Sequence, residues 1–203
     1  MYIPAINRFN DKSEIVEFMR KFSFATIITN KENLPIATHL PFIINEINDE
    51  VILSSHFARA NEQWQFLEKN LSLVIFSEPH AYISPANYEQ TLNVPTWNYL
   101  SIHAYGQAKL ITETEKVLNL LEKTIEFYEE SYRLQWDQLP GDYKLKMSKG
   151  IVAFELRVTD LQAKKKLSQN RTEKEKQNII DSLSTKDDTN EKMIAAYMKK
   201  EML

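Results

Sequence analysis

Six segments of this chain have the residue pattern of β-strands, and they outnumber the helices that could connect parallel strands. Short polar turns, such as those at 31–33 and 48–49, separate them. The six segments cover residues 24–29, 36–44, 51–53, 71–85, 98–112 and 151–158, with a break near Glu78-Pro79 in the fourth. Since each parallel pair needs a crossover, the pattern predicts a mainly β fold with helices (α+β) and antiparallel pairing. A small closed or partly open barrel would remove the exposed sheet edges.

Five further segments have the pattern of helices. The first starts after a cap at Asp11 or Ser13. The others cover residues 60–69, 112–136, 172–183 and 188–202. The segment 60–69 is expected to turn Trp64, Leu67 and Phe66 inward, and 112–136 is expected to bury Val117, Leu121, Thr124 or Ile125, and Tyr128. We therefore expect a barrel domain over 1–160 and a C-terminal segment with a helical extension over 161–203.

The composition excludes several kinds of site. There are no cysteines, so disulfides and thiolate metal sites are ruled out. Only three glycines occur, and neither GxGxxG nor the Walker pattern is present. A phosphate group would therefore have to be bound by side chains and a helix N-terminus. The sequence also lacks the ~18-residue apolar run of a membrane span and the residue order of a signal peptide, so we expect a soluble, cytoplasmic protein.

The net charge of −3 is unevenly distributed. Residues 161–203 contain ten Lys or Arg and seven Asp or Glu, a balance of +3, so the first 160 residues carry −6. A mildly acidic body with a mildly basic tail is not a strong signature of nucleic-acid binding. The same charge distribution is compatible with contact between the tail and DNA.

The segment SSHFARANEQW, residues 54–64, is the first candidate site. Ser54, Ser55 and His56 end a predicted strand, and Arg59 and Asn61 stand at the start of the next predicted helix. Hydroxyl groups, a guanidinium and a helix N-terminus are donors that bind phosphate. The alternative is that Ser55 or Asn61 only caps the helix and that Arg59 is an ordinary surface residue.

Three other clusters combine aromatic and polar residues. They are PHAYISPANY at 79–88, VPTWNYLSIHAYG at 94–106, and KKKLSQNR at 164–171. Aromatic rings of the first two can stack on a flat heterocycle, although an aromatic core with satisfied histidines explains His39 and His103 better. The lysine run is typical of a solvated face, while the residues after it can reach over a pocket.

Motifs for catalysis and metal binding are missing from the sequence. The four histidines have neither HExxH nor HxH spacing. No GxSxG motif occurs, so a nucleophilic serine is not indicated. We therefore predict no catalytic residue and no metal ligand.

The clusters at 54–64, 79–106 and 166–171, in this order, resemble the PaiB family of FMN-binding negative transcriptional regulators. The opening MYIP and the segment ATHLPF at 37–42 fit as well. The resemblance covers residues 1 to about 183. It implies a split β-barrel like that of pyridoxamine phosphate oxidases, and a homodimer with FMN at the subunit interface.

The resemblance also implies particular roles for residues. By this resemblance, the FMN phosphate is bound by the segment that contains Ser54, Ser55, His56, Arg59 and Asn61. His39 and Leu40 fall on the strand whose backbone lies along the isoalloxazine ring. Thr96, Trp97 and Asn98 reach the flavin from the second subunit, and Lys166, Gln169 and Arg171 close the pocket.

Three functions are compatible with the sequence. The leading hypothesis, an FMN-binding repressor of the protease-synthesis or sporulation type, is what the resemblance to the PaiB family implies. The alternative is an FMN-dependent oxidoreductase that acts on a small molecule, because split barrels support flavin chemistry. The third is an interaction module that has lost its flavin.

Overall fold

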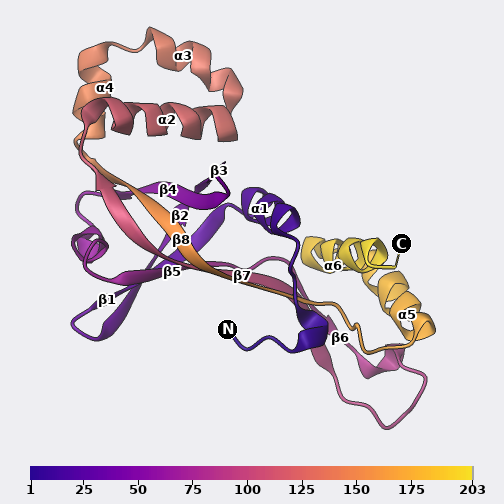
Figure 1. Cartoon of the computed structure of the whole chain (residues 1–203). Coiled ribbons are helices and arrows are strands. Elements are labelled where there is room, and N and C mark those ends of the chain that lie inside the picture. The colour runs from indigo at the N-terminus through magenta and orange to yellow at the C-terminus, as the bar shows by residue number, and fades with distance from the viewer. Residues whose placement is uncertain (203) are drawn as a thin grey trace. The chain divides into compact units, whose positions relative to one another are not determined.

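The computed structural model describes residues 1–202, and its strands form one eight-stranded sheet (Figure 1). The strands pair in the order β2-β1-β5-β7-β8-β4-β3, and β6 pairs with β7. Strand bounds are β1 Phe24–Lys31, β2 Leu34–Pro41, β3 Ile43–Ile47, β4 Glu50–Ala58, β5 Leu71–Phe76, β6 His80–Ile83, β7 Thr96–Ile111 and β8 Ile151–Lys166. The antiparallel β architecture predicted from the sequence is confirmed.

Six α-helices and four 3₁₀ turns complete the described chain. The α-helices are α1 Lys12–Lys21, α2 Thr114–Tyr128, α3 Arg133–Gln138, α4 Gly141–Ser148, α5 Glu173–Ser184 and α6 Thr189–Lys200. The 3₁₀ turns are η1 Ala5–Asn7, η2 Glu62–Phe66, η3 Pro85–Asn87 and η4 Glu130–Tyr132. None of the described helices is long and apolar enough to cross a membrane.

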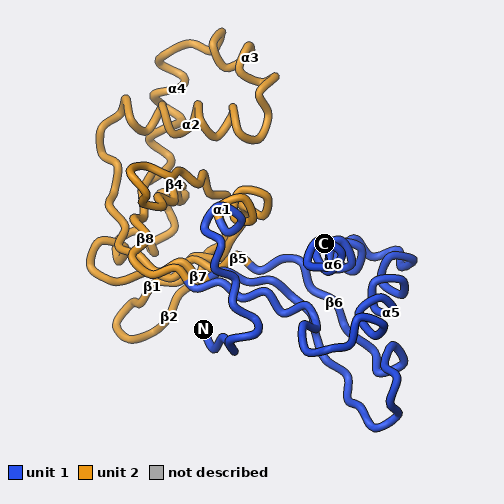
Figure 2. Tube along the Cα trace, turned by 45° about the vertical axis from the view of Figure 1, so that its right-hand side comes forward, with its two compact units in different colours: residues 1–15, 77–102, 162–203 blue, residues 16–76, 103–161 orange. Residues whose placement is uncertain are grey.

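The chain divides into two compact units, coloured separately in Figure 2. Unit 1 contains residues 1–15, 77–102 and 162–203, and unit 2 contains residues 16–76 and 103–161. Strands β7 and β8 contribute residues to both. The predicted division at residue 160 stays a prediction.

Unit 2 has an aromatic core. Phe57 and Phe154 stack with ring centroids 5.2 Å apart, and Phe42 meets the edge of Phe154 at 6.2 Å. All three side chains are fully buried. Side chains alternate between the two faces of a strand, so Leu53, Ser55 and Phe57 share one face of β4 while Ser54 and His56 share the other.

Two tight turns fix the register of the hairpins in unit 2. Asn48 and Asp49 have φ of 50° and 67°, and they connect β3 to β4 with Ile47 opposite Glu50. Both central residues of a type I′ turn need positive φ, which Asn and Asp tolerate better than other residues with side chains. The polar turn predicted at 48–49 therefore sets which side chains of β4 face the core.

Three predicted elements differ in the structure. The segment 36–44 is two strands, since Phe42 turns into the core and its N–H donates to the carbonyl of Ser23, so the chain leaves β1 and begins to pair with β4. The helix expected at 60–69 is only η2, because Gln63 turns inward and donates to the carbonyls of Ile27 and Ile36. The last strand continues to Lys166 rather than ending at 158.

The helix predicted over 112–136 is also wrong in its second half. Glu129, with φ −156° and ψ 74°, interrupts it, and α3 folds back along α2. Trp136 then donates to Glu122, and Arg133 forms ion pairs with Glu122 and Glu126. The most buried residue of α2 is Leu120, whereas the predicted Tyr128 is 48% exposed.

Candidate functional site

The predicted site residues fall in both units, so each unit is described by itself. Unit 2 holds His39, Leu40, Ser54, Ser55, His56, Arg59 and Asn61. Unit 1 holds Thr96, Trp97, Asn98, Lys166, Gln169 and Arg171.

Ser54 and Ser55 lie on opposite faces of β4. The Ser55 hydroxyl donates to the carbonyl of Pro41 at 2.6 Å and ties β4 to the end of β2. Ser54 is 3% exposed and lines a separate cavity. The structure therefore does not bring these two hydroxyls together on one ligand.

Arg59 follows β4 and is anchored at one edge of its guanidinium. Its Nε donates to the carbonyl of Lys149 at 2.6 Å, and its Nη2 donates to the carbonyl of Ile151 at 2.7 Å. A guanidinium has five N–H donors, so three stay available for an anion. The carbonyls hold the group in one orientation, which lowers the conformational cost of binding.

A cavity of about 280 Å³ lies beside Arg59. Its polar and aromatic lining includes Trp64, Thr112, Thr114 and Lys149. Hydroxyl groups, two cations and an aromatic face are the kinds of group that bind a phosphate and a flat ring. The donor set around Arg59 therefore fits the phosphate end of a flavin nucleotide, and sequence reasoning missed Lys149 because it lies 90 residues further along the chain.

Asn61 is used for the fold of η2. Its side-chain oxygen accepts from the backbone N–H of Gln63, and its amide donates to Thr38 at 2.9 Å. Asn61 therefore caps η2, which is the alternative role predicted for it from the sequence. A ligand contact of Asn61 stays a prediction.

His56 and His39 differ in their surroundings. His56 is partly buried, and burial lowers the pKa of its imidazole. None of residues 1–202 forms a hydrogen bond with the His56 ring. His39 is exposed on β2 next to the buried Leu40, and its ring stacks on Phe24 at 6.4 Å. His39 is thus not the buried core histidine that we preferred as the alternative.

In unit 1, an aromatic cluster surrounds Trp97. Its indole is 50% exposed and lies 5.9 Å from the rings of both His80 and Tyr82. Asn98, the next residue of β7, is fully buried. The hydroxyl of Ser168 donates to it at 3.0 Å, and its own amide contacts the sulfur of Met198 at 3.5 Å. Trp97 and Asn98 therefore lie on opposite faces of β7.

The three consecutive lysines are not a solvated face. Lys164 is 8% exposed and lies over the rings of Tyr2 and Tyr99. Lys165 pairs with Glu14 and Glu201. A lysine run usually faces solvent. These lysines do not, because β8 places them against the N-terminal segment, β7 and α6.

The residues predicted to close the pocket are engaged within unit 1. Lys166 donates to the hydroxyl of Thr96, and burial lowers the pKa of its ammonium. The Gln169 side chain accepts from the N–H of Leu167 and donates to the carbonyl of Lys165. The Arg171 guanidinium lies 3.6 Å above the Tyr88 ring and donates to Asn93. A flavin contact by these side chains stays a prediction.

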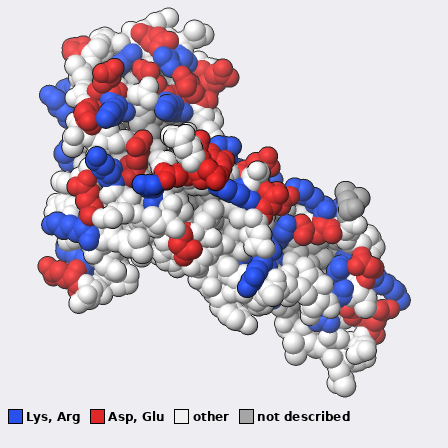
Figure 3. All heavy atoms as spheres, viewed as in Figure 1, with Lys and Arg blue, Asp and Glu red and all other residues white. Residues whose placement is uncertain are grey.

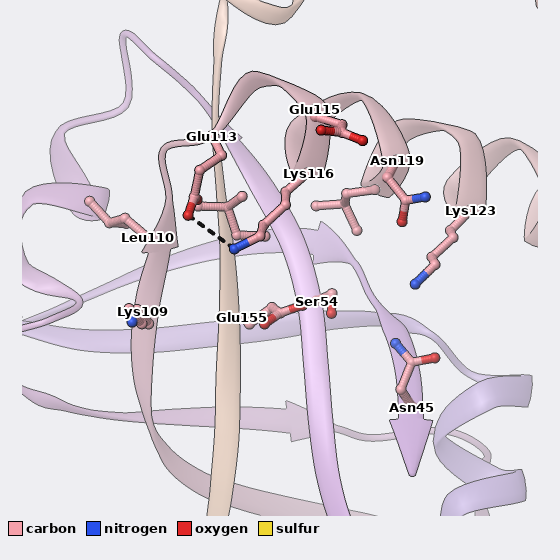
Figure 4. A pocket seen from close by; sticks show the side chains of 12 residues that line it. Asn45, Ser54, Lys109, Leu110, Glu113, Glu115, Lys116, Asn119, Lys123 and Glu155 are labelled. Atoms are coloured by element: carbon pink, nitrogen blue, oxygen red, sulfur yellow. Dashed lines mark hydrogen bonds and ion pairs between the residues drawn. The ribbon is translucent and has the colours of Figure 1, made fainter. Parts of the chain in front are cut away.

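Another cavity, of about 470 Å³, lies between α2 and the sheet of unit 2 (Figure 4). Lys116, Asn119 and Lys123 extend from α2 toward the strands that carry Ser54 and Asn45. Lys109 and Glu155 line it from β7 and β8. The sequence contains one signal for it, since residues 116, 119 and 123 lie on one face of a helix. Among the described residues, no cluster of His, Cys, Asp or Glu could hold a metal ion.

Comparison with known proteins gives the class of protein, one with an FMN-binding domain. Residues 1–160 match the family model described as "Putative FMN-binding domain". The chain therefore belongs to this family, and the predicted PaiB resemblance and the FMN cofactor are confirmed.

One relative matches this chain along almost its whole length. The chain is 39% identical over 202 residues to Protease synthase and sporulation protein PAI 2 of Bacillus subtilis, covering 98% of this chain and 97% of that protein. Among solved structures, flavocytochrome Anf3 of Azotobacter vinelandii matches with a TM-score of 0.62 at 15% identity, over 78% of this chain and 68% of that one. The FAD and heme binding protein of Mycobacterium smegmatis matches with 0.61 at 12% identity, over 79% and 73%. These likenesses show the split-barrel fold.

Proposed function

We propose that this chain is an FMN-binding negative regulator of transcription that acts as a homodimer. The observation that carries the proposal is the similarity to the sporulation protein PAI 2 along 98% of the chain. A regulatory role follows from that likeness and from the family, since fold alone does not determine function.

Arg59 is the residue that we assign to the FMN phosphate, with Lys149 and Thr114 beside it. Its three free N–H groups supply charge-assisted hydrogen bonds, which are stronger than neutral ones. The Trp64 ring lies in the same cavity. When bound, the flavin supplies one- or two-electron redox chemistry.

The dimer is supported by the aromatic cluster at Trp97. A half-exposed tryptophan with two aromatic neighbours is a type of surface that protein interfaces bury. In the proposed dimer Trp97 contributes to the flavin site of the partner subunit.

The lysine run at residues 164–166 gives little support for direct contact with DNA. Lys164 and Lys165 are engaged inside unit 1. On the face drawn in Figure 3, basic side chains are interspersed with acidic ones over α2–α4. Direct binding would show as affinity for a promoter fragment that falls steeply with salt.

A flavin titration tests the proposal. Wild-type protein is expected to bind FMN with a change in the visible spectrum, and Arg59→Ala to weaken binding by about 1.5–3 kcal/mol, the range for a hydrogen bond to a charged group. Arg157→Ala, which removes an exposed arginine paired with Glu50, is the matched control. A protein that ignores added FMN, or a monomer by native mass analysis, would contradict the proposal.

His56 favours the alternative, a flavin-dependent oxidoreductase. The His56 imidazole has no hydrogen-bond partner among residues 1–202, so it can hold a small substrate by a hydrogen bond. Turnover of a reduced nicotinamide by the FMN-loaded protein, reduced in His56→Ala, is the expected result. A rate equal to that of free FMN would remove this alternative.

A further inference from the structure

Arg59 is bound to the turn between α4 and β8 through both its backbone and its side chain. Its backbone N–H donates to the carbonyl of Gly150 at 2.8 Å. Its side-chain Nε and Nη2 donate to the carbonyls of Lys149 and Ile151, at 2.6 and 2.7 Å. Carbonyl groups of three consecutive residues therefore determine where Arg59 lies and how its guanidinium is turned.

Trp64 binds the other polar group of the Arg59 backbone. Its indole Nε1 donates to the carbonyl of Arg59 at 3.1 Å. The same residue lines the cavity of about 280 Å³ beside Arg59. The main chain of Arg59 is thus held on one side by the α4–β8 turn and on the other by Trp64.

The two side-chain hydrogen bonds leave one edge of the guanidinium free. They use Nε and one N–H of Nη2, which share an edge of the planar group. The second N–H of Nη2 and one N–H of Nη1 form a parallel pair on the next edge, and such a pair binds two oxygens of one phosphate group. Among residues 1–202, none accepts a hydrogen bond from Nη1.

The orientation of this N–H pair matters for the choice between two flavins. FMN and riboflavin have the same ring and the same ribityl chain, and they differ only in the terminal phosphate. The cavity is smaller than the ~300–1,000 Å³ of a site that encloses a whole small molecule, so it has room for one end of a flavin. A guanidinium that is already oriented there adds affinity only for the flavin that carries the phosphate.

We propose that Trp64 and the α4–β8 turn, residues 149–151, are positioning groups that orient Arg59 toward a phosphomonoester, so that the chain selects FMN over riboflavin. The selection rests on the proposed contact between Arg59 and the FMN phosphate, and Trp64 acts on that contact through Arg59. Holding the arginine in one orientation lowers the entropy lost when the phosphate binds.

Titrations of wild-type protein with FMN and with riboflavin, followed by flavin fluorescence, test the proposal. FMN should bind at least about tenfold more tightly than riboflavin, the factor for one hydrogen bond to a charged group. Trp64→Phe keeps an aromatic ring in the cavity and removes the N–H that holds Arg59. It should weaken FMN about fivefold, the factor for one hydrogen bond, and leave riboflavin unchanged.

Arg59→Lys is the second variant, because it keeps the positive charge and loses both side-chain bonds to the turn. It should reduce the preference for FMN over riboflavin by about fivefold or more. A full wild-type preference in this variant would mean that charge alone selects the phosphate, and it would overturn the proposal.

Trp136→Phe is the matched control, because the Trp136 indole donates to Glu122 and lies outside this cavity. It should leave both affinities unchanged. If Trp64→Phe keeps the wild-type preference, or weakens FMN and riboflavin equally, Trp64 has only a structural role and the proposal fails. Equal binding of the two flavins by wild type also overturns it, although FMN binding itself then stands. A protein that binds neither flavin contradicts the proposed function as well.

Discussion

The two compact units both have buried apolar residues, and each also shows a contact pattern of its own. In unit 2, fully buried phenylalanines of β4, β8 and the β2–β3 junction pack edge to face and face to face. In unit 1, charged and amide side chains connect segments that are far apart in the sequence, as Lys165 connects Glu14 to Glu201. Apolar packing responds to lost volume, whereas ion pairs respond to pH and salt. We therefore expect the phenylalanine cluster of unit 2 to be most sensitive to lost side-chain volume, and the Lys165 contacts of unit 1 to be most sensitive to pH and salt.

The largest effect is expected from the core of unit 2. Phe154→Ala should lower the free energy of unfolding by about 3–5 kcal/mol, because it leaves a cavity among close-packed rings. Urea denaturation measures this. The control Phe24→Ala removes a ring that is 65% exposed, and it should change stability by about 0.5 kcal/mol or less. Equal losses in the two variants would refute the view that buried rings hold unit 2 together.

A smaller effect is expected at Gly106. A Cβ there would lie 2.2 Å from the carbonyl oxygen of Arg157, so the strands would have to move apart. Gly106→Ala should cost about 1–3 kcal/mol, as overpacking does. Gly141→Ala has nothing within 4 Å and lies in α4, so it should be neutral or stabilise by up to about 1 kcal/mol. Thermal unfolding of the two variants measures the difference, and equal stability of Gly106→Ala and Gly141→Ala would contradict this prediction.

Among the polar contacts of unit 1, a large contribution is expected from Arg171. Arg171→Ala removes its stacking on Tyr88, its hydrogen bond to Asn93 and its ion pair with Glu175. Hydrogen exchange of the α5 amides should report a local loss of about 1.5–3 kcal/mol. Lys174→Ala breaks a pair with Glu89 that solvent screens, so the loss of protection should be much smaller than in Arg171→Ala. A loss at Lys174 as large as that at Arg171 would contradict this ranking.

The smallest effect concerns acid. The hydrogen bond from Lys200 lowers the pKa of Glu14, and Lys165 adds to this. A carboxyl group with a lowered pKa contributes stability above its unfolded pKa and loses it as the pH falls through the folded pKa. Protection of the α6 amides should therefore decrease in the acid range below about pH 4.3, the unfolded value for Glu. Glu14→Gln should remove that dependence, and an unchanged profile in the variant would assign it to another group.

The sequence predicted the fold where local signals were strong. Polar turns at 31–33 and 48–49 and alternating strands between them led to the correct antiparallel pairing. Asp11 caps α1 as predicted, since its carboxylate accepts from the N–H of Glu14. The errors arose where tertiary contacts override local pattern, as at Phe42, which enters the core, and at Glu129, where the helix stops so that Trp136 can return to α2.

The candidate site was predictable only in part, for a similar reason. Arg59 was predicted because it follows a strand in a donor-rich segment, whereas Lys149 and Thr114, which line the same cavity, come from elsewhere in the chain. The role of the lysine run was missed because a run of charges carries no information about the aromatic rings that β8 brings beside it. The sequence motifs predicted a group of residues without revealing which faces of the strands they share.

The two-residue turn at Asn48 and Asp49 has a consequence for how this chain can vary in length. One residue inserted or deleted between that turn and Ser54 would exchange the faces of Ser54 and Ser55. The hydroxyl that holds Pro41 would then point toward α2, and Phe57 would leave the core. Natural variants of this chain are thus expected to keep the length of this hairpin while they change individual side chains, and to place insertions and deletions in other loops.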